Sequence, residues 1–190
     1  MMNLSPRNQL LIGIALGALM AMTRGQHFAT VNLPSASWAV FFLAGVLLKP
    51  RWVFPALFVE ASLFDMAAVQ WAGVSDWCMS PAYWMLVPAY GTLWFGGRLY
   101  AGMHRHQWSN LLLLAAMASL SAFVCYLFSG GGFLFFSGRY PDPSMSQLVE
   151  RIALYYPRNL TNLALYLGVA SVFYLGLNAA FAARQREVQS

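Results

Sequence analysis

Charge is scarce in this sequence. Only 9% of its 190 residues are charged, eleven lysines and arginines against six aspartates and glutamates, whereas 59% are hydrophobic and 16% are aromatic. A soluble domain carries roughly 25% charged residues, so there is too little charge here to cover a globule. The long apolar runs lack the alternation of polar and apolar residues that a membrane barrel needs. The sequence therefore predicts an all-α integral membrane protein.

The basic residues form no patch. The net charge is +5, but the lysines and arginines occur singly, at the ends of apolar runs. This pattern is typical of loop charges that fix orientation in a membrane, and we therefore expect no nucleic-acid partner. The first 22 residues resemble a signal peptide, but no small-residue cleavage site precedes Arg24, so we interpret them as a retained first helix.

Six apolar stretches are long enough to be considered as spans, given that a spanning helix needs about 20 residues. They cover residues 8–23, 35–48, 52–71, 82–100, 110–128 and 145–183, within one domain of residues 1–190. The second stretch is short and the last is too long for one span. Pro157 is expected either to kink the last helix or to separate an outer segment, residues 146–156, from the span.

With six spans, alternate loops lie on opposite sides of the membrane. The side that holds both termini carries seven of the eleven basic residues, namely Arg7, Lys49, Arg51, Arg98, Arg105, Arg184 and Arg186. An excess of basic residues marks the cytoplasmic side, so the sequence predicts cytoplasmic N- and C-termini. The loops after the first, third and fifth spans are then expected to face outward.

Ionisable groups inside spans are costly, so each is a candidate functional residue. Asp65 falls in the outer half of the third span, and Arg151 and Arg158 share one face at the outer end of the last. His27 follows the first span on the same side. An ion pair between Asp65 and Arg151 is the structural alternative, and residues 130–132, all glycine, are expected to form a flexible loop. The polar residues together predict an outward cavity with aromatic walls.

The two cysteines leave three interpretations open. Cys78 lies in the outer loop between the third and fourth spans, and Cys125 lies near the outer end of the fifth. Cys78 is a ligand, a disulfide partner of Cys125 or an inert thiol. A thiolate is a soft donor that suits a metal. Cys125 is otherwise expected to be a buried core residue, as free cysteines often are.

Three segments carry a resemblance to a known family: residues 76–83, with the sequence Asp-Trp-Cys-Met-Ser-Pro-Ala-Tyr, residues 58–65, and Gln26-His27-Phe28. The chain resembles the substrate-binding S-components of energy-coupling-factor (ECF) vitamin importers, and more narrowly the BtuM family of solitary cobalamin-specific S-components. The resemblance implies an ECF S-component-like bundle of six transmembrane helices. It also implies a multi-pass protein of the bacterial inner (cytoplasmic) membrane, with its binding site facing outward.

The resemblance implies a definite chemistry as well. In that family a cysteine of this loop is the lower axial ligand of cobalt in bound, base-off cobalamin, and Cys78 is the matching position. Thiolate ligation is associated there with removal of cyanide from cyanocobalamin. The expected function is thus uptake of cobalamin as bound substrate, with decyanation as the accompanying reaction. The other substrate-binding positions that the resemblance implies are Asp65, Tyr83, His27, Arg151 and Arg158.

Importers of this type dock on an ECF coupling subunit, which works with ATPases, through small residues of the first helix. Gly13, Gly17 and Ala21 form such a stripe, although packing within the bundle would use the same residues. Two other functions stay open. One is a membrane thiol or redox protein, or a structural subunit, with a Cys78–Cys125 pair. The other is an S-component for a different vitamin.

Overall fold

The computed structural model describes residues 4–24, 33–103 and 109–189, and in this part of the chain every regular element is helical. The side chains of Cys78, Ser109 and residues 177–189 lie outside the description. The main helices are α1 (Pro6–Arg24), α2 (Ser37–Leu47), α3 (Val53–Trp71), α4 (Leu86–Met103), α5 (Ser109–Tyr126) and α7 (Met145–Gln189). Shorter helices are η2 (Asp76–Cys78), η3 (Pro81–Met85), η4 (Leu127–Gly131) and α6 (Gly132–Phe136).

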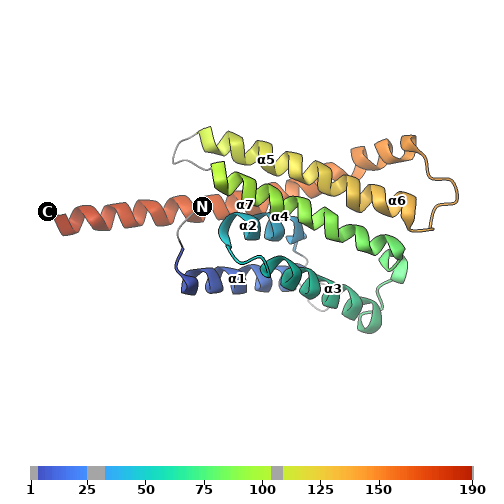
Figure 1. The fold of residues 1–190 in the computed structure, drawn as a ribbon, viewed down its shortest axis with the longest axis horizontal. Coiled ribbons are helices and arrows are strands. Elements are labelled where there is room, and N and C mark those ends of the chain that lie inside the picture. The colour runs from blue at the N-terminus through green and yellow to red at the C-terminus, as the bar shows by residue number, and fades with distance from the viewer. Residues whose placement is uncertain (1–3, 25–32, 104–108, 190) are drawn as a thin grey trace.

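The main helices alternate in direction along the bundle (Figure 1). α1, α3 and the rod formed by α5, η4 and α6 run one way, and α2, α4 and α7 run the other. The start of α1 and the end of α7 therefore lie at the same end of the bundle. Each of the six predicted helices is confirmed as a helix, and most ends fall within a few residues of the predicted ones.

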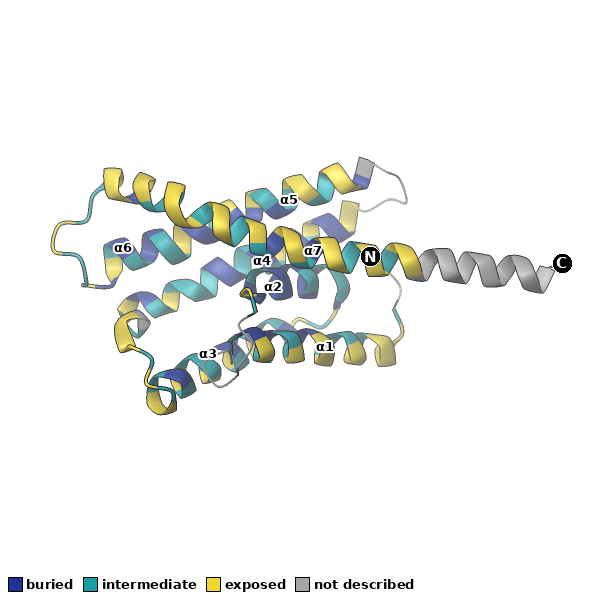
Figure 2. Ribbon diagram, turned by 180° about the vertical axis from the view of Figure 1, so that it is seen from behind, coloured by how far each residue is buried: buried dark blue, intermediate teal, exposed yellow. Residues whose placement is uncertain are grey.

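Within the described residues, three helices are long and apolar enough to cross a membrane: Val53–Trp71, Asn110–Phe136 and Met145–Gly176. In the most apolar part of Met145–Gly176 only 11% of the residues are buried. Figure 2 shows exposed positions along the outer side of α7, and these include Val172 and Phe173. Apolar side chains that face outward in such numbers are costly in water and favourable in lipid.

The short helix α2 lies at the centre of the molecule. Phe41 and Phe42 are completely buried, and the aromatic ring of Phe41 stacks on Tyr90 of α4 with ring centroids 4.4 Å apart. Two glycines allow α2 and α4 to approach this closely. A Cβ atom on Gly45 would overlap the carbonyl oxygen of Trp94, and one on Gly97 would overlap that of Phe42. At 11 residues α2 is too short to span a bilayer by itself, and its packing makes it a core element.

The predicted flexible loop at residues 130–132 is wrong. The chain continues from α5 through η4, a π-helical turn, into α6, and Figure 1 shows one rod. The Ser129 hydroxyl donates to the Cys125 carbonyl at 2.9 Å, which competes with the normal helical bond to that oxygen. The Gly132 N–H faces the carbonyls of Leu127, Phe128 and Ser129, and its bond to Leu127, five residues back, is the π-helical one. A π turn of this kind inserts into a helix without ending it.

The glycines of this turn make room for neighbouring side chains. A Cβ on Gly130 would lie 2.7 Å from the Tyr126 ring, and one on Gly132 would lie 2.8 Å from the Met85 side chain of η3. The Tyr126 hydroxyl can thus reach α7, where it donates to the Arg151 carbonyl at 2.8 Å. The run of glycines is therefore a packing surface for η3 and α7.

The last helix passes through Pro157 without interruption. The alternative of a separate outer segment at residues 146–156 is therefore wrong. Proline lacks a backbone N–H, so the bond that would reach the Ala153 carbonyl is missing. Figure 2 shows the first part of α7 running at an angle to the straight part that follows, as expected near a proline.

Candidate functional site

Two of the predicted site residues are in direct contact. The Tyr83 hydroxyl, on η3, donates a hydrogen bond to Asp65 Oδ2, on α3, at 2.9 Å. This bond joins α3 to the segment that leads from α3 to α4, which also carries Cys78.

Arg24, a residue that sequence reasoning left out of the site, completes this contact. Its Nη1 lies 3.2 Å from Asp65 Oδ2, and its Nη2 donates to the Tyr90 hydroxyl at 2.6 Å. The expected alternative, an ion pair between Asp65 and Arg151, is wrong, because Asp65 takes Arg24 as its cation. The missed signal was a lone basic residue at the end of the first span, on the same side as Asp65.

We refer to Arg24, Asp65, Tyr83 and Tyr90 as the Arg24 cluster. Its side chains are shielded from solvent, with 15% of the Arg24 side chain and 28% of the Asp65 side chain exposed. Tyr90 is buried and stacks on Phe41 of α2, so the cluster rests on the core. Charges in such a place interact strongly because little water screens them. The cluster links α1, α3, η3 and α4 at one end of the bundle.

Arg151 contributes to a different group of side chains. Its Nη1 donates to the Tyr140 hydroxyl at 2.9 Å, and its guanidinium carbon lies 5.3 Å from the ring centroids of both Tyr140 and Tyr155. These contacts lie within α7 and the segment before it. Arg158, one further predicted site residue, is exposed. The described contacts do not join either arginine to Asp65.

The turn that carries Cys78 is a short 3₁₀ helix, η2. The Ser75 side chain caps it by accepting the Trp77 N–H at 3.2 Å, and Met79 N–H closes it on the Asp76 carbonyl at 2.7 Å. From the segment after α6, the Arg139 guanidinium carbon lies 5.1 Å from the centre of the Trp77 ring. The Cys78 side chain and the whole of His27 lie outside the described residues.

Cys125 is a free thiol with no exposed surface, inside α5. The interpretation of Cys125 as a buried core residue is confirmed. The structure holds no disulfide at Cys125, which leaves the interpretation of a Cys78–Cys125 pair without support.

The small residues of α1 lie against other parts of the same chain. A Cβ on Gly13 would meet Leu48 at 3.7 Å, and one on Gly17 would lie 3.1 Å from Glu60 Oε2. Gly13 and Gly17 thus serve packing within the bundle. This is the alternative that we gave above for the stripe that they form with Ala21.

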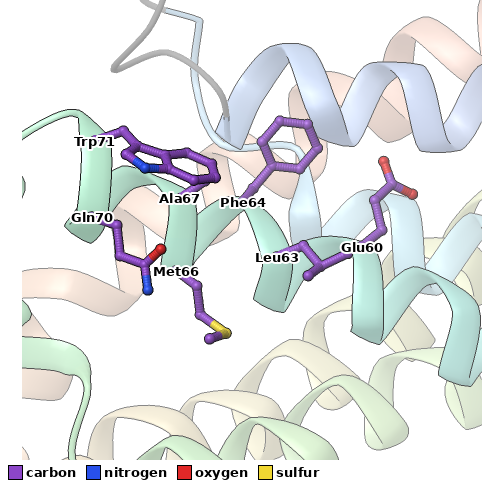
Figure 3. A pocket seen from close by; sticks show the side chains of 7 residues that line it. All are labelled: Glu60, Leu63, Phe64, Met66, Ala67, Gln70 and Trp71. Atoms are coloured by element: carbon purple, nitrogen blue, oxygen red, sulfur yellow. The ribbon is translucent and has the colours of Figure 1, made fainter.

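A hollow of about 420 Å³ runs along α3 and is almost wholly apolar. Figure 3 shows its lining residues, Glu60, Leu63, Phe64, Met66, Ala67, Gln70 and Trp71. The Phe64 and Trp71 rings project side by side. Within the described ranges no group of three His, Cys, Asp or Glu side chains could hold a metal ion.

Comparison with known proteins gives no assignment: no protein-family model matches this chain, and no curated protein matches it either.

Proposed function

We propose that this chain is a cobalamin-binding membrane protein that takes up its ligand at the end of the bundle where Asp65, Tyr83 and η2 lie. The observation that carries the proposal is the hydrogen bond between Tyr83 and Asp65. These two residues come from two of the segments on which the family resemblance rests. Their contact brings those segments together beside the turn that carries Cys78.

The proposed setting is a bacterial inner membrane that holds a bundle of six helices, with α2 as a core helix too short to span the bilayer by itself, cytoplasmic termini and a binding site open to the outside. The alternating direction of the helices and the apolar outer surface of α7 support this arrangement. Under the predicted orientation, the ends of α1 and α3 and the turns η2 and η3 face outward.

In the proposed chemistry, the Cys78 thiolate binds the lower face of the corrin cobalt. A thiolate is a soft donor and gives electron density to the metal. The bond between cobalt and an upper cyanide ligand then weakens. Cyanide leaves as an anion with the electron pair of that bond, so cobalt keeps its oxidation state. The proposed role of Asp65, Tyr83 and His27 is to hold the peripheral amides of the corrin, and that of Arg151 or Arg158 is to hold the nucleotide-loop phosphate.

The competing proposal of a thiol or redox protein has less support, because its pair needs Cys125 and that thiol is free and buried. An S-component for a different vitamin would keep the fold but leave Cys78 without a role. Docking on a coupling subunit through Gly13, Gly17 and Ala21 would have to accommodate the internal contacts of the two glycines with Leu48 and Glu60.

The test is a visible spectrum of the purified protein titrated with cyanocobalamin, in wild type, Cys78→Ala and Cys125→Ala. The matched control is Cys125→Ala, since it removes a thiol from the core and leaves η2 intact. We expect a thiolate–cobalt spectrum and release of cyanide in wild type and Cys125→Ala, and neither in Cys78→Ala. Binding without a spectral change would reject the cysteine chemistry, and no binding in any variant would reject cobalamin as the ligand.

A further inference from the structure

The geometry points to Arg24 as a positioning residue for the turn that carries Cys78, a role that it exerts through Asp65 and Tyr83. We infer that the Arg24–Asp65 ion pair holds the Asp65 carboxylate where Tyr83 can donate to it, and thereby holds η3 and the adjoining η2 against α3. What this positioning means for cobalt ligation rests on the proposed function. The positioning of the turn by Arg24 does not.

The first step is the position of Asp65 Oδ2, which is shared between two groups. The Arg24 Nη1 lies 3.2 Å away and the Tyr83 hydroxyl lies 2.9 Å away. The same oxygen thus lies next to the positive charge of Arg24 on α1 and accepts a hydrogen bond from the Tyr83 hydroxyl on η3. Without the guanidinium, the shielded carboxylate would lack its counter-ion and would turn toward water. That change weakens the bond to Tyr83.

The second step is the anchoring of Arg24 itself. Its Nη2 donates to the Tyr90 hydroxyl at 2.6 Å, and its guanidinium carbon lies 5.7 Å from the centre of the Tyr90 ring. Tyr90 is fixed in turn by its stacking on Phe41 of the core helix α2. The planar fork of an arginine lets one nitrogen donate to Tyr90 while the other stays in ion-pair contact with Asp65, a geometry that a lysine lacks. The core thus determines where the guanidinium lies, and the guanidinium determines where Asp65 lies.

The third step is the short distance along the chain from Tyr83 to the cysteine. Between them lie only residues 79–82, in which Met79 closes η2 and Ser80 precedes η3. η3 is also pressed against α6 where Met85 fits beside Gly132. The segment is therefore fixed at Tyr83 and at Met85. Loss of the Tyr83 contact loosens the part that carries Cys78, which then keeps only the contacts of Arg139 with Asp76 and Trp77 on the side of α6.

The bundle offers a matched control at its other end. Arg98 of α4 also joins two elements, because its Nη2 donates to the Leu48 and Lys49 carbonyls at 3.2 and 2.7 Å and its guanidinium lies 4.1 Å from the centre of the Trp94 ring. Arg98→Gln removes a bridging arginine of similar reach but leaves the Asp65–Tyr83 contact untouched. Arg24→Gln and Arg98→Gln therefore separate positioning of the turn from general loosening of the bundle.

The experiment measures the rate at which a membrane-impermeant maleimide labels Cys78 in the full-length protein without ligand, with the labelled peptide identified by mass spectrometry. The buried Cys125 serves as an internal check that the bundle stays folded. We expect Arg24→Gln and Asp65→Asn each to label about fivefold faster than wild type, the factor that corresponds to one lost hydrogen bond. The double variant should label no faster than Arg24→Gln, because both changes break one chain of contacts.

Two milder variants guard against misfolding. Tyr90→Phe removes only the hydroxyl that anchors Arg24, and Arg24→Lys keeps the charge without the fork, so both should label at rates between wild type and Arg24→Gln. Labelling of Arg24→Gln at the wild-type rate, or an equal increase in Arg98→Gln, would overturn the inference. If this pattern holds while neither wild type nor any variant binds cyanocobalamin, the positioning stands and the proposed function is wrong.

Discussion

The contact between α2 and α4 at Gly97 allows a sharp test of the fold. A Cβ at this position would overlap the Phe42 carbonyl oxygen and lie 3.0 Å from the Val46 backbone nitrogen. Both obstacles are backbone atoms inside a helix, so no side-chain rotation can relieve them. In Gly97→Ala, α4 must therefore move away from α2 as a unit, and the contact at Gly45 must open with it.

The expected cost follows from two opposing effects. Extra atoms in a well-packed core typically cost about 1–3 kcal/mol, and backbone obstacles favour the upper end of that range. Alanine is better than glycine inside a helix by roughly 0.5–1 kcal/mol, which offsets part of the cost. The free energy of unfolding should thus fall by about 2 kcal/mol. For a chain of this length that corresponds to a melting temperature lower by about 4–8 °C.

The assay is thermal unfolding in detergent, followed by the helical circular dichroism signal. The matched control is Gly102→Ala on the same helix, because no atom of the described part of the chain lies within 4 Å of a Cβ at Gly102. This control should melt at the wild-type temperature or slightly above it. The close crossing of α2 and α4 would be refuted if Gly97→Ala melted at or above the temperature of Gly102→Ala.

Two further predictions concern the segment around the π turn. Gly132→Ala should lower the free energy of unfolding by about 1–2 kcal/mol, since its Cβ would lie 2.8 Å from both Cβ and Cγ of Met85. Met85→Ala in the same chain removes the contact with Cγ but keeps the contact with Cβ, so in the same melting assay the double variant should lose less stability than the two single variants added together; a strictly additive loss would contradict this packing. Thiol titration of unfolded, unreduced protein should find two free thiols per chain, because Cys125 is free, and a count of zero would show a disulfide with Cys78.

The helices could be predicted from the sequence because apolar runs and their flanking polar residues are local signals. The length of each run fixed the helices, yet it did not say which helix is central. α2 lies inside because Gly45 and Gly97 allow α4 to approach it, and such a contact depends on two distant positions at once. Sequence reasoning therefore treated α2 as a short span, where the structure has a core helix.

In the candidate site, too, single residues could be predicted from local signals, whereas their contacts with distant residues could not. Asp65 could be singled out because a carboxylate within a span is costly, and Tyr83 entered through the family resemblance. The cation that pairs with Asp65 could not be deduced, because Arg24 and Arg151 have the same charge and both were expected on the outer side. The choice between them depends on which helix packs beside α3, and that is a property of the whole bundle.

Because of the π turn, the number of residues in the glycine run determines which face of α6 points toward the core. Buried positions along α5, such as Ala118, Ala122 and Cys125, follow an ordinary helical period. Continued at that period, the pattern would turn Phe136 inward, yet Phe136 is 60% exposed and Leu134 is buried. One extra residue, worth about 100° of rotation, accounts for the change. Deleting a single glycine would rotate α6 by about 100° and turn Phe136 toward the core. A stretch that looks like a tolerant linker is therefore a place where insertions and deletions should be selected against.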